Sequence, residues 1–394
     1  MKKGIVLILL SIFILTGCSS KIIIEESTKD KGILNKYNIT VREIKDNFQY
    51  DYQFFTPLYF KDNNVIGLID IIREGAFTED EVNIPIKINT NGEFVTNDDK
   101  VLNEFLENDL RQNYTVQAKG INSEGLHTRD RKYFYYDLKE DLKFYLEDLD
   151  ELYYEMENKF KLREEEVYDL KNYYILEMVG YEDSEDSSKP LIMKGKAAIV
   201  IDKINKTYYK TKINNDLPYI YYFNEKEDSI MALDFTGKIK KLALIEGDID
   251  YLDYKNINID EYTKDSFHDF RFTNKYVTEN YIVLSRYNEG KYKTFIYDIN
   301  SGKTKIYNES PFLQKVSNTN YFIVYSEDGI YLSELNENME FDLLYKLSAI
   351  ENYDSTAFIG DKKKIFAVLK KYNHENNSLF LADKKYLLIN IEEN

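Results

Sequence analysis

Short apolar runs separated by polar turns recur along this chain from about residue 37 to its end. The clearest example covers residues 281–308, where residues 281–285, 294–298 and 304–307 each have the composition of a strand. Residues 288–291 and 300–303 separate these runs and are rich in Asn, Ser and Gly, which favour turns. This pattern predicts a β-meander, in which three neighbouring strands run antiparallel.

Six further segments follow the same plan, so we expect seven units and a mainly β chain. Each unit carries an acidic or amide residue where its second strand ends, and these markers are Asn89, Asp137, Asp202, Asp234, Asp298, Glu334 and Asp383. Their mean spacing is close to the repeat length of propeller blades. The pattern therefore predicts a seven-unit, β-propeller-like array of β-meanders.

One turn also carries a family resemblance. The sequence Asp-x-Asn-Ser-Gly-Lys at residues 298–303 resembles the blade turns of bacterial propellers of the TolB and YVTN-like kind. The resemblance covers one well-preserved unit and several divergent ones. It implies a fold and no particular activity, because propellers host many functions.

Two segments have a helical period instead. Apolar residues recur at steps of three and four between residues 140 and 161, and a shorter pattern of the same kind lies near residues 98–112. In the propeller interpretation both are helical insertions. In the alternative interpretation, residues 37–171 form an N-terminal α+β domain, and a β-meander domain follows a boundary near residue 171.

The N-terminus resembles a bacterial lipoprotein signal. Lys2 and Lys3 precede an apolar run that ends at Leu15-Thr16-Gly17-Cys18, and Cys18 is the single cysteine of the chain. The resemblance implies cleavage after residue 17 and attachment of acyl chains, such as palmitate, to Cys18. Two acyl chains give stable membrane attachment where one is marginal. We therefore expect a signal peptide at 1–17, a lipid anchor and tether at 18–36, and the β-propeller-like domain at 37–394.

Charge narrows the range of partners. The net charge is −17, with 69 acidic and 52 basic residues, so nucleic acid is disfavoured, because phosphate binding requires clustered Lys and Arg. An intramolecular disulfide is impossible with one cysteine. The abundance of Lys, Asn, Ile and Tyr indicates an AT-rich genome, which fits a Gram-positive host. We expect the protein on the extracytoplasmic face of the cell membrane, anchored through Cys18.

The known catalytic and phosphate-binding motifs that we compared with the sequence are not present in complete form. Because no two glycines lie four apart, the Gly-x-Ser-x-Gly nucleophile elbow is absent. Gly120 and Gly125 have phosphate-loop spacing, but Leu126 and His127 occupy the Lys and Ser/Thr positions. His374-Glu375 lacks the second histidine of the helical zinc-protease motif. We expect no cofactor, and the sequence leaves a metal site undetermined.

Two weaker hypotheses concern charged loops. His127 and His374 fall in equivalent loops, and a metal site built from them would need His268 or carboxylates to complete it. Asp248, Asp250 and Asp253 have a spacing that suits calcium ligands. Bystander positions are the simpler interpretation for the histidines, and a solvated turn is the simpler one for the aspartates. Several loops of one predicted rim are acidic, and these residues are Glu74, Glu79, Asp80, Glu182, Asp183, Glu185, Asp186, Glu225, Glu227, Asp228, Glu327 and Asp328. A negative rim steers basic partners, but a chain this acidic places acids in loops anywhere.

The sequence therefore predicts a lipid-anchored extracytoplasmic binding or scaffold protein without a recognisable catalytic site. The sequence does not identify its ligand, for which an envelope protein and a glycan are the expected classes. One alternative is a glycan-active propeller enzyme that uses paired carboxylates, which leave no local sequence signature. The other is a solute-binding lipoprotein, whose usual alternation of strands and helices is not visible here.

Overall fold

The computed structural model describes fifteen stretches of the chain: residues 33–45, 54–61, 63–74, 79–89, 94–96, 121–123, 134–137, 142–145, 161–182, 192–213, 219–259, 273–288, 291–317, 319–375 and 378–394. Within them nearly every element is a β-strand, and one short 3₁₀ helix, η2, spans Ser348–Ile350. Cys18 and the helix expected near 98–112 lie outside these stretches. The mainly β fold class is confirmed.

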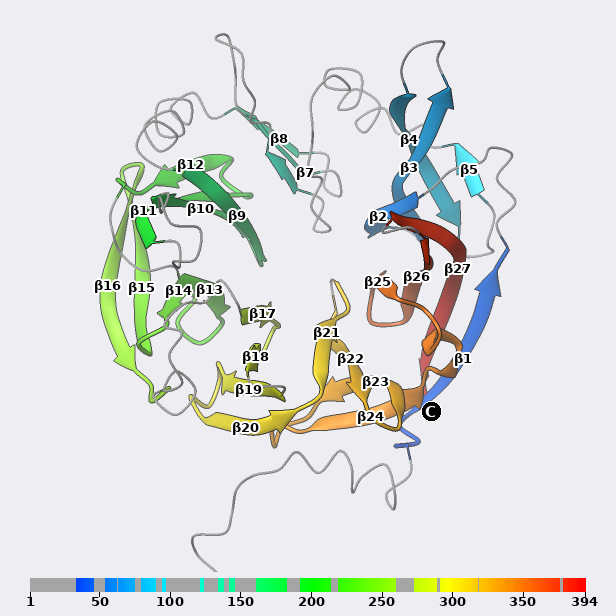
Figure 1. The fold of residues 1–394 in the computed structure, drawn as a ribbon. Coiled ribbons are helices and arrows are strands. Elements are labelled where there is room, and N and C mark those ends of the chain that lie inside the picture. Colours follow the sequence, from blue (N-terminus) through cyan, green and yellow to red (C-terminus); the bar gives the residue numbers. More distant parts are fainter. Residues whose placement is uncertain are drawn as a thin grey trace, which may run out of the picture.

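The strands form a ring of sheets in a β-propeller-like arrangement (Figure 1). Each of the first two sheets consists of strands that are consecutive in the chain. The first contains β2 (Phe54–Lys61), β3 (Asn64–Glu74), β4 (Glu79–Asn89) and β5 (Phe94–Thr96). The second contains β6 (Ile121–Ser123), β7 (Phe134–Asp137) and β8 (Leu142–Tyr145).

The next sheet has eight strands, which form two meanders. The first meander comprises β9 (Lys161–Leu170), β10 (Tyr173–Glu182), β11 (Ile192–Asp202) and β12 (Thr207–Lys210). The second comprises β13 (Tyr219–Asn224), β14 (Ser229–Asp234), β15 (Lys238–Ile245) and β16 (Asp248–Asn256). A single parallel residue pair, Lys210 with Asp248, joins β12 to β16. The described strands therefore make six hydrogen-bonded sheets where the sequence predicts seven units.

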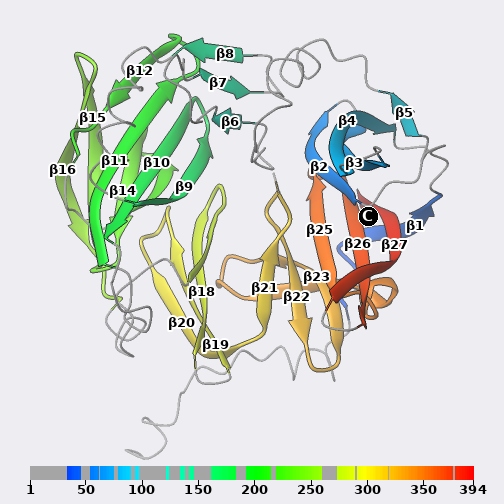
Figure 2. The same cartoon turned by 45° about the horizontal axis from the view of Figure 1, so that its top comes forward.

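Three four-stranded sheets complete the ring and lie side by side in Figure 2. One contains β17 (Thr273–Val277), β18 (Tyr281–Asn288), β19 (Lys291–Asp298) and β20 (Thr304–Ser310). The next contains β21 (Phe312–Lys315), β22 (Tyr321–Ser326), β23 (Gly329–Leu335) and β24 (Phe341–Lys346). The last contains β25 (Ser355–Gly360), β26 (Lys364–Glu375), β27 (Ser378–Glu393) and β1 (Tyr37–Ile44).

The first described strand joins the last one. β1 pairs antiparallel with β27 over its whole length, from Tyr37 opposite Glu393 to Ile44 opposite Tyr386. The side chain of Ile44 is buried in an apolar cluster that also contains Phe55 and Val65 from the N-terminal part and Phe366 from the C-terminal part. The two ends of the described chain therefore share one sheet and one core.

Many strands are buried on both faces, which explains their continuous apolar runs. In β14, five of the six residues are buried, and residues 197–202 of β11 are buried without interruption. A strand packed on both sides has no solvent face, so its sequence is not expected to alternate between apolar and polar residues. Neighbouring sheets meet through these faces, for example where Val283 and Ile296 pack with Phe322 and Val324.

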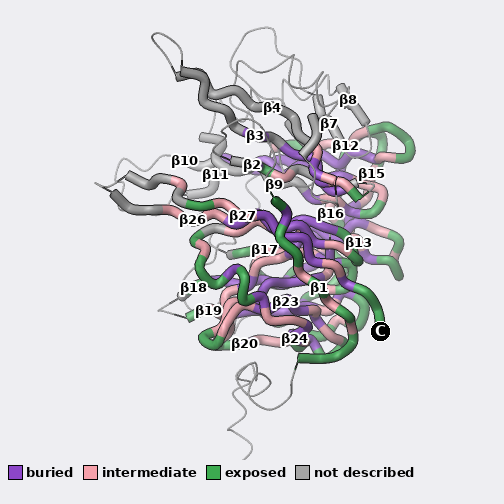
Figure 3. Tube along the Cα trace, turned by 90° about the vertical axis from the view of Figure 1, so that its right-hand side faces the viewer, coloured by how far each residue is buried: buried purple, intermediate pink, exposed green. Residues whose placement is uncertain are grey.

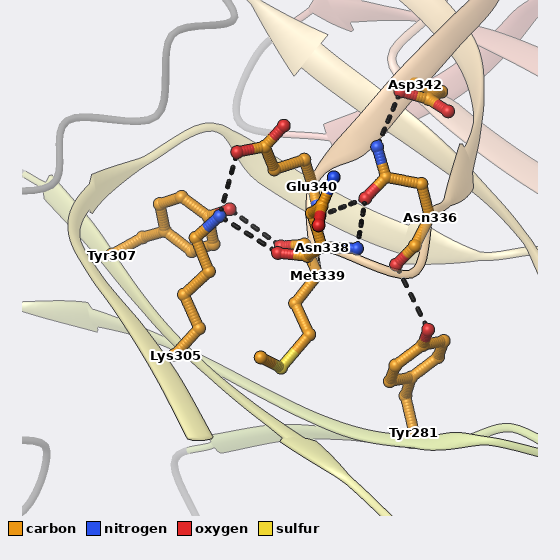
Figure 4. A network of polar contacts seen from close by, with 8 residues as sticks. All are labelled: Tyr281, Lys305, Tyr307, Asn336, Asn338, Met339, Glu340 and Asp342. Carbon is orange, nitrogen blue, oxygen red and sulfur yellow. Dashed lines mark hydrogen bonds and ion pairs between the residues drawn. The ribbon is translucent and has the colours of Figure 1, made fainter. Parts of the chain in front are cut away.

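Polar contacts also fix one sheet against the next. Figure 4 shows Tyr281 of β18 and two residues of β20, Lys305 and Tyr307, reaching the turn at residues 336–340. The hydroxyl groups of Tyr281 and Tyr307 donate hydrogen bonds to carbonyl oxygens of this turn, with distances of 3.0 and 2.7 Å. The Nζ atom of Lys305 lies 3.0 Å from Oε1 of Glu340. The turn therefore belongs to one sheet and is held by its neighbour.

The ring has two distinct rims. The parallel pair Lys210–Asp248 joins the two meanders of the eight-stranded sheet, and the parallel pair Ser317–Ile359 joins two neighbouring sheets, so equivalent strands of adjacent meanders run in the same direction. Turns between first and second strands, and between third and fourth strands, therefore lie on one side, called here the terminal rim because β1 begins and β27 ends there. Turns between second and third strands lie on the opposite side, called the hairpin rim. Figure 3 shows the C-terminus on one side of the molecule and the β18–β19 hairpin on the other.

One helical prediction is wrong where the structure tests it. Residues 142–145, at the start of the helix expected over 140–161, form β8 and pair with β7, with Phe144 opposite Tyr135. Strand pairing between aromatic residues outweighs the helical period here, because periodicity over a few apolar residues does not separate the two states. Residues 146–160 lie outside the described stretches. Residues 171 and 172, at the expected sub-boundary, form the turn between β9 and β10.

Candidate functional site

Four aromatic side chains form a continuous row on the hairpin rim. We call Tyr287, Tyr292, Phe312 and Tyr325 the aromatic row. Successive ring centroids lie 5.0, 5.3 and 5.2 Å apart, and the rings are tilted by 57°, 43° and 44° to one another. These separations lie within the range of favourable aromatic contacts. The row therefore presents linked ring surfaces across the boundary between two sheets.

The row consists of two cross-strand pairs. Tyr287 of β18 lies directly opposite Tyr292 of β19, and Phe312 of β21 lies directly opposite Tyr325 of β22. Aromatic residues favour strands and stabilise antiparallel pairs when they face each other, which is why these segments fold as they do. The contact between Tyr292 and Phe312 then joins the two sheets.

The row is exposed at Tyr287 and partly accessible at its other three members. Tyr287 is 63% exposed, and Tyr292, Phe312 and Tyr325 are each half-buried. Partial burial holds the rings in place while part of each surface stays accessible. Neighbouring aromatic rings that remain partly accessible make this surface a candidate binding region.

An uncharged hydrogen-bonding group lies beside one end of the row. The Tyr325 hydroxyl donates to Oε1 of Gln314 at 2.9 Å and shares a 2.7 Å hydrogen bond with the Thr356 hydroxyl. The Gln314 amide nitrogen donates to the carbonyl oxygen of Thr356 at 3.0 Å. Burial raises the pKa of Tyr325, although its bond to Thr356 opposes this shift. The Tyr325 hydroxyl therefore stays protonated and acts as a fixed donor.

A second uncharged group lies near the other end. The Thr294 hydroxyl donates to Ser285 Oγ at 3.2 Å and shares a 2.7 Å hydrogen bond with Ser310 Oγ. Ser310 lies opposite Tyr292 across a bulge between β19 and β20. Thr294 and Ser285 are fully buried, so these hydroxyls stabilise the strands that carry the tyrosines. Both ends of the row thus rest on neutral polar side chains.

Sequence reasoning did not find this row. Other tyrosines on strands are core residues instead: Tyr221 and Tyr222 are 0% and 1% exposed. The available signal was Tyr287 and Tyr292 on either side of a tight turn, which places them opposite each other. The partnership of Tyr292 with Phe312 crosses two sheets and has no local signature.

The acidic loops do not all share one rim. Glu327 and Asp328 follow β22, and Glu74 and Glu79 end β3 and begin β4, so both pairs lie on the hairpin rim. Residues 225–228 join β13 to β14 and lie on the terminal rim. The expected single acidic face is therefore wrong for this turn. The unit predicted at 219–244 begins with β13, the first strand of its meander, whereas the unit at 281–308 begins with a second strand, β18, so the equivalent turns fall on opposite rims.

Ion pairs and hydrogen bonds confirm the position of that turn. Lys171, in the β9–β10 turn, lies 3.0 Å from Glu225 and 3.7 Å from Asp228. Lys226 donates to the carbonyl oxygen of Asn300, in the β19–β20 turn, at 2.7 Å. Three neighbouring turns of the terminal rim are therefore in contact, and the acids at residues 225–228 are partly neutralised by lysine.

The proposed metal ligands do not gather in the described part of the chain. Within it, no three His, Cys, Asp or Glu side chains are arranged to hold a metal ion. Asp248, Asp250 and Asp253 lie along strand β16, where an extended backbone does not wrap around a cation. His374 lies in β26 opposite Leu379, and His127 and His268 fall outside the described stretches. Among the residues described, no helix is long and apolar enough to cross a membrane.

A buried ion pair is the other chemically notable feature. The Lys196 Nζ and a carboxylate oxygen of Glu177 lie 3.0 Å apart, and both side chains are 1% exposed. The same Nζ lies 5.7 and 5.8 Å from the ring centroids of Tyr221 and Tyr251, whose hydroxyls share a 2.8 Å hydrogen bond. A glutamate within the apolar run at 173–180 was the available sequence signal. The pair lies between two meanders of the eight-stranded sheet.

Comparisons with known proteins return fold likenesses of low similarity. No protein-family model matches the chain, and no curated protein matches its sequence. An acylaminoacyl peptidase from Pyrococcus horikoshii is 12% identical with a TM-score of 0.41, over 86% of this chain and 52% of that chain. This chain thus spans about half the length of that peptidase. The C-terminal WD40 domain of Sif2 is 9% identical with a TM-score of 0.34, over 89% of this chain and 98% of that chain.

An alpha-L-arabinofuranosidase from Podospora anserina is 8% identical with a TM-score of 0.26, over 58% of this chain and 90% of that chain. At these identities and TM-scores the likenesses assign no activity to this chain. The fold described above rests on the strand pairing of the chain itself, and the function rests on the chemistry of its surface.

Proposed function

We propose that this chain is a binding protein held on the extracytoplasmic face of a Gram-positive cell membrane by a lipid on Cys18, and that the hairpin rim contacts its ligand. The observation that carries the binding role is the aromatic row. Four linked rings on paired strands, 63% exposed at Tyr287, form a rigid and accessible surface. Rigid aromatic groups lose little conformational entropy when a ligand binds.

We further propose that the ring contains seven units. The β9–β12 and β13–β16 meanders each have four consecutive antiparallel strands, and a single residue pair joins them. Counting them separately gives seven meanders, with β1 as the fourth strand of the last. A closed ring suits a binding protein because each unit packs against a neighbour on both sides. The fold is then stabilised by these contacts between units, and the rim is left available for a ligand.

The anchor is tested by comparing the full chain with a Cys18→Ala variant in a Gram-positive host. We expect the full chain in the membrane fraction, with the mass of its N-terminal peptide increased by a diacylglycerol on Cys18. The variant should leave that fraction, because its apolar run alone is too short to span comfortably. An unmodified Cys18, or equal membrane retention of both forms, would contradict the anchor.

The binding role is tested by photo-cross-linking in intact cells. A photoreactive phenylalanine analogue replaces Tyr287, and in the control chain it replaces Tyr254, which is 44% exposed on β16. We expect a discrete cross-linked envelope component from position 287 and none from position 254. Equal products from both positions would reject the hairpin rim as the binding surface. Turnover of a glycan by the purified chain would favour the alternative of a glycan-active enzyme.

A further inference from the structure

We propose that the aromatic row binds the neutral sugar rings of an envelope glycan. This inference rests on the proposed binding function and names the ligand class of the same site. A pyranose ring has an apolar C–H face and a rim of hydroxyl groups. The row offers the matching surface, because its rings stack on flat apolar faces while Tyr325, Gln314 and Thr356 supply hydrogen-bonding groups beside them.

Charge separates this ligand from others. The whole chain carries −17, yet every member of the aromatic row and of the two hydrogen-bonding groups beside it is uncharged at neutral pH. Charged side chains near the row are largely paired: Lys291 forms an ion pair with Glu309, and Asp328, in the β22–β23 turn, accepts hydrogen bonds from the hydroxyls of Ser326 and Tyr331. Glu327 of the same turn is exposed and, among the described residues, is the carboxylate closest in sequence to the row. A phosphate-bearing ligand requires clustered cations, and a cationic ligand is better served by carboxylates facing it. A neutral, hydroxyl-rich ligand fits this surface best.

The geometry also suits an extended ligand. The row runs from β18 through β19 and β21 to β22, so it crosses from one sheet to the next. Thr356 of β25 extends the polar edge to a third sheet. A chain of several sugar rings can therefore contact more than one aromatic ring, and repeated weak stacking contacts along one ligand add to its affinity.

The position of the row agrees with this ligand. β1 begins on the terminal rim, where Lys36 pairs with Glu334 at 2.7 Å and Asn394 donates to the carbonyl oxygen of Asn35 at 2.7 Å. A tether from Cys18 would enter the domain there. The aromatic row lies on the opposite rim, so a membrane-anchored molecule turns the row away from the bilayer and toward the surrounding glycan layer.

Isothermal titration calorimetry with the full chain in detergent tests the proposal. The probes are soluble, uncharged N-acetylglucosamine tetrasaccharide and protein-free glycan strands released from Gram-positive peptidoglycan. We expect saturable binding of at least one probe. Tyr287→Ala and Tyr292→Ala should each weaken that binding at least tenfold, while Tyr287→Phe retains it, because the phenylalanine ring still stacks.

Tyr254→Ala is the matched control, because it removes an exposed tyrosine from a strand outside the row. Circular dichroism during urea unfolding shows whether each variant folds. We expect the substitutions of Tyr287 to affect folding least, because this side chain is exposed. Absence of binding to both probes, or equal affinity in the Tyr287→Ala chain, overturns the proposal. Binding of a proline-rich peptide in place of the sugars also overturns it, since such peptides dock on aromatic grooves too.

The sugar-binding proposal and the lipid anchor can be rejected independently of each other. Titration in detergent requires no lipid, so loss of sugar binding leaves the membrane attachment through Cys18 standing. An unmodified Cys18 in the fractionation experiment removes the argument from orientation and leaves the chemical match between row and sugar to be judged by calorimetry.

Discussion

The buried pair of Glu177 and Lys196 carries a large desolvation cost for a single residue contact. Its two charges are 3.0 Å apart with both side chains 1% exposed, and they face Tyr221 and Tyr251 of the next meander. Removing two charges from water costs several kcal/mol per ion, which their mutual attraction offsets only while both are present. The pair therefore ties the register of β10 and β11 to the meander that packs on them.

We predict that Lys196→Met destabilises the fold by about 3–5 kcal/mol, because it leaves the carboxylate of Glu177 buried without its cation. The double variant Glu177→Leu with Lys196→Met should recover most of this loss, since no charge is then buried. The measurement is the urea concentration at the unfolding midpoint. A double variant no more stable than Lys196→Met would show that the pair acts through something other than charge compensation.

Asp298 shows how one side chain shapes a turn. Its Oδ1 accepts hydrogen bonds from the backbone N–H groups of Asn300 and Ser301, and its Oδ2 accepts one from the Ser301 hydroxyl at 2.6 Å. Burial by itself raises the pKa of Asp298, but these hydrogen bonds and the nearby charge of Lys226 outweigh it, so the pKa is lowered. Folding therefore favours the ionised form.

A lowered pKa in the folded state sets the direction of a pH dependence. We predict that the contribution of Asp298 is fully present above its unfolded pKa of about 3.9, and is lost as the pH falls through the lower folded value. Asp298→Asn should be less stable than the natural chain at pH 7, and the gap should close toward pH 2. Unfolding by urea across this range measures it. Ser301→Ala should shrink the same pH dependence, and a gap that widens in acid would contradict the assignment.

At the scale of elements, β1 closes the ring. It covers the edge of β27 with eight consecutive residue pairs, and Ile39 and Val41 pack on the core of the last two sheets. Without it, β27 would present a long unpaired edge, which is a template for association with other chains. The strand that follows the expected tether is thus also the one that protects the C-terminal sheet.

We predict that a chain starting at residue 46 associates and unfolds at a lower temperature than a chain starting at residue 33. Size-exclusion chromatography and thermal unfolding measure the two effects, and a synthetic peptide of residues 33–45 should reverse both by adding the missing strand. Within the intact strand, Ile44→Ala should cost about 2–5 kcal/mol, because Ile44 is 4% exposed. The exposed Thr40→Ala is its control, and an equal loss there would argue against core packing.

At the scale of the whole molecule, the two rims divide two tasks. The terminal rim carries the start of β1, the C-terminus and the contacting turns around Lys171 and Lys226. The hairpin rim carries the aromatic row. Under the proposed function, a tether at one rim and a binding surface at the other would let the molecule hold a ligand at a distance from the membrane.

This division predicts a difference in distance from the bilayer. Because the sulfur of a lipidated Cys18 cannot react, a cysteine introduced at Lys226 or at Lys291 takes a fluorescent label selectively. In vesicles containing spin-labelled headgroups, we expect stronger quenching at position 226 than at position 291. The unanchored Cys18→Ala form should show no difference, and stronger quenching at 291 would reverse the proposed orientation.

The local structure was predictable wherever it is determined by neighbours in the chain. The strands and turns at residues 281–308 occur as expected, because each apolar run and each turn residue acts within a few positions. The marker Asp383 is the instructive exception. It lies within β27 opposite Lys371, whereas Asn390 holds the position opposite the start of β26, because this hairpin is longer than the others.

The sequence by itself determined the mainly β fold class and the meanders, since alternation and turn residues are local properties, and the lipid on Cys18 stays a prediction from a local motif. Only the tertiary structure decided which strands became neighbours. The pairing of β1 with β27, the packing of Lys196 against Tyr221 and the contact of Tyr292 with Phe312 join residues from different units. Such contacts depend on the order and direction of whole strands. Many different local sequences are compatible with the same strand order, so no short sequence pattern predicts these contacts.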